Sequence, residues 1–227
     1  LAVDRVDLTI REGELRCLIG PNGAGKSTLF RCLTGQLRPT AGCILWRGRD
    51  VTGREPFAMA RLGIGIKTQV PSLFDGLTVM ESVVLAVRRR HGEAFARKAA
   101  VEVLERLEIA ALGPRQAGRL AHGQRQLVEL AMVVAPEPDL VILDEPTAGM
   151  TAEETRRTAA LIRELGRHHA IVVVEHDMQF IKSIARTVTV LHQGRVLIED
   201  EAALVMADPR VRDVYLGREA GHRVLAP

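Results

Sequence analysis

Short, mainly apolar runs recur along the chain, and most of them are followed by a segment with helical spacing. We expect the runs to be buried strands, because strands covered on both faces lack a polar alternation. The apolar runs lie at residues 15–19, 64–68, 140–143, 170–174 and 188–191. Helical spacing is found at residues 26–33, 123–135, 153–165 and 178–184. This alternation predicts an α/β fold with a mainly parallel sheet.

Two regions depart from the alternation. From Thr78 to Leu107 the pattern is helical and rather polar, and Gly113-Pro114 interrupts it before a helix resumes at Gly123. We expect residues of about 77–135 to form an inserted helical subdomain in a single domain spanning 1–227, whose core is formed by 1–76 and 136–227. Residues 188–198 are typical of a hairpin that turns at Gln193-Gly194.

Composition narrows the class of protein. Aromatic residues make up 3% of the 227 residues and apolar residues 47%, so the core must be aliphatic, as in a buried parallel sheet. The net charge of +3 and the lack of stacking aromatics argue against nucleic-acid binding. No apolar run approaches the roughly 18 residues that span a bilayer, so any membrane role must come through a partner.

The cysteines and the first residue of the chain lead to two further expectations, about the redox state of the thiols and about the start of the protein. Cys17, Cys32 and Cys43 have neither metal-ligand nor CxxC spacing, and we expect reduced, buried thiols in a cytosolic protein. The chain begins with Leu1 and enters an apolar stretch at once, so we expect that a segment upstream is missing.

One nine-residue segment carries phosphate-binding chemistry. It fits the pattern G-x-x-x-x-G-K-[ST] between a predicted strand and a predicted helix, and consists of Gly20, Pro21, Asn22, Gly23, Ala24, Gly25, Lys26, Ser27 and Thr28. Glycines let backbone N–H groups surround phosphate oxygens, and the helix directs its positive end at them. Lys26 would bind the β- and γ-phosphates of ATP, and Ser27 would bind Mg²⁺. We call residues 20–28 the phosphate loop.

A second strand ends in two carboxylates. The apolar run 140–143 is followed by Asp144 and Glu145. In a chain with a phosphate loop, Asp144 is placed to hold Mg²⁺, and Glu145 is placed to act as the general base on the attacking water. We therefore expect an ATP-hydrolysing enzyme.

Three further motifs give the chain a family resemblance. The signature segment, defined here as residues 120–124, resembles the start of L-S-x-G-Q-x-Q and consists of Leu120, Ala121, His122, Gly123 and Gln124. Gln69 follows a strand and precedes the helical insertion, and His176 follows the run 170–174. With the phosphate loop and Asp144-Glu145, these motifs stand in the order of an ABC transporter ATP-binding subunit, which the chain resembles over essentially its whole length.

The resemblance implies a fold and a mechanism. The fold is a P-loop NTPase (RecA-like) core with an N-terminal antiparallel β part and an inserted helical subdomain. Two such subunits, identical or related, clasp two ATP molecules head to tail, with the signature of each facing the γ-phosphate held by the other, so that Gly123 would act in trans. Gln69 would contact Mg²⁺ and water, and His176 would contact the γ-phosphate and help to align the water of Glu145.

The resemblance also implies partners and a location. Such subunits act at the cytoplasmic face of the inner membrane, bound peripherally to transmembrane permease subunits, and importers further depend on a periplasmic solute-binding protein. No nucleic acid takes part.

Three positions depart from the family pattern. Ala121 replaces the serine of the signature and removes a hydroxyl expected to bond the γ-phosphate across the dimer. Thr151 replaces an aspartate, and we expect it to cap the next helix together with Glu154. The aromatic residue that stacks on adenine in the family lies upstream of Val3, outside this sequence.

Finer features resemble one subgroup of the family. The segments 70–79, 148–151 and 209–217 resemble importer subunits for branched-chain amino acids and, more closely, for urea or short amides. A lipopolysaccharide-type exporter subunit shares much of this pattern and stays open as an alternative. A soluble ABC ATPase would normally carry two cassettes or a long coiled-coil insertion, and the chain has neither.

Overall fold

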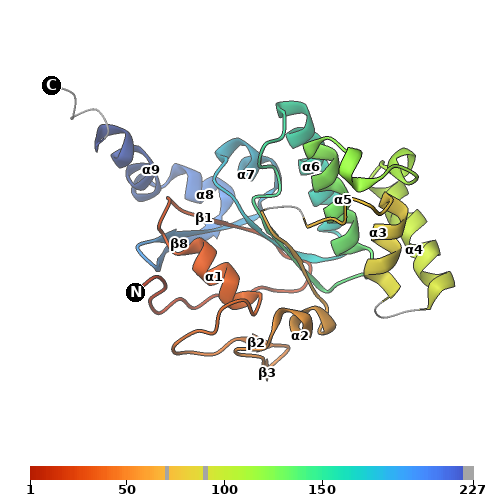
Figure 1. Cartoon of the computed structure of the whole chain (residues 1–227). Helices are drawn as coiled ribbons and strands as arrows, with labels where there is room; N and C mark the ends of the chain where they lie inside the picture. Colours follow the sequence, from red (N-terminus) through yellow and green to blue (C-terminus); the bar gives the residue numbers. More distant parts are fainter. Residues whose placement is uncertain (70–71, 89–91, 222–227) are drawn as a thin grey trace.

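The computed structural model describes residues 1–69, 72–88 and 92–221 (Figure 1). Val70 and Pro71, with which the importer-like segment 70–79 begins, lie outside the described residues. A six-stranded sheet forms the centre, in the order β4-β5-β6-β1-β7-β8. Its strands are β1 (Leu15–Ile19), β4 (Ile64–Lys67), β5 (Leu140–Asp144), β6 (Ala170–Val174), β7 (Thr187–His192) and β8 (Arg195–Glu201).

The predicted α/β class and parallel sheet are confirmed. All neighbours from β4 to β7 run parallel, and only β8 pairs antiparallel, through the predicted hairpin turn at Gln193-Gly194. Because parallel strands put their carboxyl ends at one edge, the residues that follow β1, β4, β5 and β6 meet along a single edge. Four of the expected functional segments follow these strands.

The strands are apolar on both faces because helices cover both. In β1, Leu15, Cys17 and Ile19 belong to one hydrophobic core and Leu18 to the other, and β5 and β6 alternate in the same way. Figure 1 shows α1 (Lys26–Leu33) and α2 (Pro56–Arg61) on one side of the sheet, and α6 (Ala152–Leu165) and α7 (Met178–Ile184) on the other. The architecture is a three-layer sandwich of helix, sheet and helix.

The described residues between 79 and 134 form helices and no strand of the main sheet. They form α3 (Val79–Arg88), α4 (Glu93–Arg106), the short 3₁₀ helices η1 (Ala110–Leu112) and η2 (Ala117–Arg119), and α5 (His122–Val134). The helical pattern predicted from Thr78 to Leu107 is divided in two, because Gly92 precedes α4 in an extended conformation, with ψ 164°. Figure 1 shows α3, α4 and α5 gathered at one end of the molecule, away from α8 and α9.

The antiparallel β part is smaller than expected. It consists of β2 (Leu45–Trp46) and β3 (Arg49–Asp50), paired around a turn at Arg47-Gly48. Residues 1–14 form no strand. After β8 the described chain ends in α8 (Ala202–Ala207) and α9 (Pro209–Gly221).

The start of α6 confirms the expected capping box. The Thr151 hydroxyl accepts a hydrogen bond from the Glu154 N–H at 3.3 Å, and the Glu154 carboxylate accepts one from the Thr151 N–H at 2.8 Å. Two N–H groups that the helix cannot satisfy internally are thereby paired.

Thr151→Ala is expected to lower the free energy of unfolding by about 0.5–2 kcal/mol, because the substitution removes the side-chain acceptor. Denaturant unfolding monitored by circular dichroism measures the change. Thr151→Ser keeps the hydroxyl and serves as the control. An alanine variant as stable as the serine variant would contradict the capping role.

The expectation for the cysteines is confirmed only in part. All three are free thiols, but Cys17 alone is fully buried, and burial raises its pKa well above the ordinary range. Cys32 is partly exposed and Cys43 is exposed, since they lie on the outer side of α1 and in the loop before β2. Within the described residues, no helix combines the length and the hydropathy that crossing a membrane requires.

Candidate nucleotide-binding and hydrolysis site

The candidate site lies along the edge where the parallel strands end. β1 leads into the phosphate loop, β4 into Gln69, β5 into Glu145 and β6 into His176. The registers bring these ends together, because Asp144 pairs with Val174 and Lys67 with Leu143 across neighbouring strands. Gln69 and Glu145, which are 76 residues apart in the sequence, thus share one edge with the phosphate loop and His176.

The phosphate loop needs glycine where other backbone comes close. Gly20 has φ 150°, and a Cβ there would collide with the carbonyl oxygen of Leu191. Gly25 has φ 102°, and a Cβ there would collide with the carbonyl oxygen of Ala2. A left-handed Gly25 directly before α1 turns the chain from the loop into the helix.

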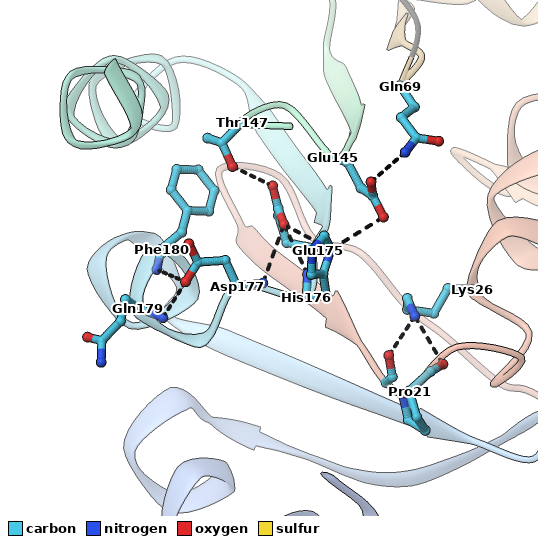
Figure 2. Close-up of polar contacts among 11 residues, drawn as sticks. Pro21, Lys26, Gln69, Glu145, Thr147, Glu175, His176, Asp177, Gln179 and Phe180 are labelled. Carbon is cyan, nitrogen blue, oxygen red and sulfur yellow. Dashed lines mark hydrogen bonds and ion pairs between the residues drawn. The ribbon is translucent and has the colours of Figure 1, made fainter. Parts of the chain in front are cut away.

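The charged and hydroxyl groups of the loop come from the first turn of α1. Lys26 begins the helix, and its ammonium donates hydrogen bonds to the carbonyls of Gly20 at 2.5 Å and Pro21 at 3.2 Å (Figure 2). The cation therefore lies across the loop. Ser27 and Thr28 follow in the same turn, at the positive end of the helix. The arrangement suits a polyphosphate.

Glu145 has a strained backbone that the sequence did not predict. Its φ is +45°, in the left-handed region that residues with a Cβ seldom adopt. Its N–H donates to the carbonyl of Val174 at 2.9 Å, so the end of β6 holds this conformation. Strain of this kind costs on the order of 1–3 kcal/mol and is concentrated at functional sites.

Gln69 and His176 converge on the two oxygens of Glu145. The Gln69 amide donates to Oε2 of Glu145 at 2.6 Å, and Nδ1 of His176 lies 3.4 Å from Oε1 (Figure 2). The three side chains come from three different strand ends. The carboxylate is therefore oriented from both sides, as a base that must align a water molecule requires.

Asp144 has the chemistry of a magnesium ligand. Burial raises the pKa of this carboxyl, and the negative charge of Glu145 raises it further. A bound cation would offset both effects. Among the described residues no three His, Cys, Asp or Glu side chains are placed to hold a metal, so Mg²⁺ would depend on phosphate oxygens and water as well as Asp144, Ser27 and Gln69. Oxygen donors of this kind fit Mg²⁺.

The signature segment lies beside the loop that follows Glu145. His122 Nε2 lies 2.9 Å from the carbonyl oxygen of Ala148, and a Cβ on Gly123 would collide with the Glu154 carboxylate. Ala121 precedes α5 without a side-chain acceptor, although Gln124 Oε1 accepts its N–H at 3.2 Å. Leu120 is buried and Ala121 is exposed. The helices α5 and α1 lie apart in Figure 1, so the structure does not join the signature to the phosphate loop within one chain.

This geometry agrees with a comparison of the whole chain with protein families. A family model described as ABC transporter matches residues 3–148. The chain belongs to the ABC transporter family. It is an ATP-binding cassette, and the predicted ATPase activity coupled to transport is confirmed at the level of the family.

Individual ABC proteins resemble the chain along almost its whole length. The high-affinity branched-chain amino acid transport ATP-binding protein LivG of Salmonella typhimurium is 37% identical, covering 96% of this chain and 92% of LivG. The lipopolysaccharide export system ATP-binding protein LptB of Acidithiobacillus ferridurans is 32% identical, covering 96% and 91%. The crystal structure of the ADP conformation of MJ1267, an ATP-binding cassette of an ABC transporter, has a TM-score of 0.86 at 28% identity, covering 95% and 92%.

One buried ion pair in this ABC cassette was missed by the sequence analysis. Lys67 Nζ lies 3.4 Å from Glu129 Oε2, and the two side chains are 1% and 9% exposed. Burial lowers the pKa of Lys67 and raises that of Glu129, while each charge opposes the shift of the other. Glu129 also accepts the N–H of Ser72 at 3.1 Å. The α5 helix is thereby attached to the chain on both sides of Gln69. A lysine at the end of an otherwise apolar strand was the available signal.

Proposed function

We propose that the chain is the ATP-hydrolysing subunit of an importer for a small polar solute, of the class of branched-chain amino acids, short amides or urea. The observation that carries the proposal is the similarity to LivG across 96% of the chain. The exporter alternative is less favoured, because LptB is the less similar of the two relatives. The cassette would bind transmembrane permease subunits at the cytoplasmic face of the inner membrane and depend on a periplasmic binding protein.

Uptake measurements in a strain that lacks the chain test the proposal. Loss of labelled leucine or urea uptake is expected, with recovery when the unmodified chain is supplied but not when Glu145→Gln is supplied. The solute whose uptake is lost identifies the importer subgroup to which the chain belongs. Normal uptake of these solutes together with a defect in lipopolysaccharide export would overturn the importer proposal and leave the ATPase in place.

Within the site, each predicted residue receives a proposed role. The phosphate loop holds the phosphates of ATP, and the Lys26 ammonium binds the β- and γ-phosphates. Glu145 accepts the proton of the attacking water, with Gln69 and His176 holding the carboxylate and the water in line. Ser27, Asp144 and Gln69 would hold Mg²⁺, which would supply positive charge to offset the charge that develops on the phosphate oxygens. The helices at about 77–135 form the subdomain that carries the signature.

The site needs a second copy or a related chain to be complete. The N–H groups that begin α5 are a phosphate-binding surface, and the signature lies beside the 148–154 segment of its own chain. A head-to-tail dimer, with each signature over the other chain's phosphate loop, gives both sites the missing donors. Leu120, Ala121, His122, Gly123 and Gln124 then act in trans.

Ala121→Ser is expected to tighten closure of the dimer around ATP by about 1.5–3 kcal/mol, because the new hydroxyl can bond a charged phosphate oxygen. The same hydroxyl can cap α5. Sedimentation against ATP concentration, in a Glu145→Gln background that prevents turnover, measures the change. Weaker dimerisation than with Ala121 would contradict the trans position of this residue.

A further inference from the structure

A buried carboxylate with no role in the proposed chemistry lies next to His176. Glu175 is 2% exposed and follows the last residue of β6. Its Oε1 accepts a hydrogen bond from the Thr147 hydroxyl at 2.7 Å, and its Oε2 accepts one from the His176 N–H at 3.0 Å (Figure 2). Both oxygens of a buried carboxylate are thereby satisfied, as its burial requires.

Thr147 ties this carboxylate to the loop that carries Glu145. It lies two residues after Glu145 and is itself 9% exposed. The same loop is held by the hydrogen bond from the Glu145 N–H to Val174 at 2.9 Å. One side-chain bond and one backbone bond therefore join the loop after β5 to the end of β6.

The segment after Glu175 is held from its other end as well. Asp177 caps the N-terminus of α7 and accepts hydrogen bonds from the N–H groups of Gln179 at 2.8 Å and Phe180 at 3.2 Å. His176 thus lies between two anchored carboxylates, while its own side chain is 62% exposed and has Nδ1 3.4 Å from Glu145. The same ring nitrogen lies 3.7 Å from Glu175 Oε2, so Glu175 faces both the backbone N–H and the ring of His176.

Stability alone does not explain a carboxylate at this position. Apolar side chains of similar volume commonly replace buried charged groups without loss of stability. The neighbouring positions of β6 are all apolar, from Ala170 to Val174. A carboxylate at the end of β6 can instead hold the loop after β5 and the segment after β6 in a fixed relative position.

We propose that Glu175 is a positioning residue, which binds the Thr147 hydroxyl and the His176 backbone N–H at once and so fixes His176 relative to Glu145. The inference rests on the proposed roles of Glu145 and His176 in ATP hydrolysis. A displacement of about 1 Å in such an arrangement can cost up to a hundredfold in rate.

The test uses Thr147→Val, which keeps the shape of the side chain and changes no charge but removes the hydroxyl. We expect kcat for ATP to fall on the order of tenfold with KM within about twofold, since phosphate binding is untouched. Thr147→Ser keeps the hydroxyl and is expected to stay within about twofold of the unmodified kcat. Glu175→Gln can keep both contacts if the bond to Thr147 reverses: the amide oxygen accepts from the His176 N–H, and the amide N–H donates to the Thr147 hydroxyl oxygen. This variant is therefore expected to retain most of the activity.

The decisive comparison repeats Thr147→Val in a His176→Ala background. If Glu175 acts through His176, the second substitution causes no further loss, because residues that act as a unit are not additive. The same tenfold loss in both backgrounds, or an unchanged kcat in folded Thr147→Val, would overturn the inference. Thr147→Ala replaces the valine variant if thermal unfolding shows that the latter does not fold.

The outcomes separate this inference from the proposed function. A protein without ATPase activity would contradict the proposed function and the inference together. An active ATPase whose Thr147 variants behave like the unmodified protein would contradict the inference alone.

Discussion

In the Glu145→Gln variant, ATP is expected to bind as tightly as in the unmodified protein but to be hydrolysed about 10²–10⁴ times more slowly. The amide keeps the shape of the carboxylate and can still contact Gln69 and His176. In the unmodified protein these two side chains lie 2.6 and 3.4 Å from the two carboxylate oxygens of Glu145. It cannot accept a proton from water. Because the bound ATP is not consumed, the ATP-bound dimer should accumulate.

Phosphate release at saturating ATP measures the loss, and calorimetry measures the retained affinity. Glu102→Gln, on the exposed side of α4, makes the same change in charge away from the site and is expected to have no effect. Hydrolysis within a few-fold of the unmodified rate would show that another group removes the proton. Loss of ATP binding would show instead that Glu145 holds the nucleotide.

Lys26→Ala is expected to weaken ATP binding by roughly 30-fold to several thousandfold, which corresponds to about 2–5 kcal/mol for a buried charge contact. The ammonium lies across the phosphate loop, bonded to the Gly20 and Pro21 carbonyls, and no other lysine belongs to residues 20–28. Calorimetric titration with a slowly hydrolysed ATP analogue measures the change. Lys98→Ala, on the exposed face of α4, is the matched control. Equal affinity in the two variants would refute the phosphate-loop assignment.

The sheet could be predicted from the sequence because its strands are short, apolar on both faces and bounded by turns. All five apolar runs became strands, and the Gln193-Gly194 hairpin formed where the pattern indicated. The capping box of Thr151 and Glu154 was equally accessible, since both partners lie within one helical turn. Features that depend on residues close together in the sequence can be predicted from local sequence patterns.

Features that depend on the fold could not be predicted in this way. The bond from Gln69 to Glu145 spans 76 positions, and only the family resemblance suggested that the two residues act together. The positive φ of Glu145 and the buried pair of Lys67 with Glu129 result from how β4, β5, β6 and α5 pack. The division of the predicted 78–107 helix was missed, although the polar run 88–93, which contains Gly92, was the available signal.

The central claim is that one chain holds ATP and the signature of another chain completes the site. Ala121→Glu tests it in the Glu145→Gln background, because residue 121 is exposed and a carboxylate there would face the γ-phosphate of the opposite subunit. Sedimentation velocity with Mg²⁺ and ATP is expected to give a dimer for Glu145→Gln. For the double variant we expect a monomer that still binds ATP, since like charges at an interface cost several kcal/mol. A double variant that dimerises with ATP as readily as Glu145→Gln would contradict the claim.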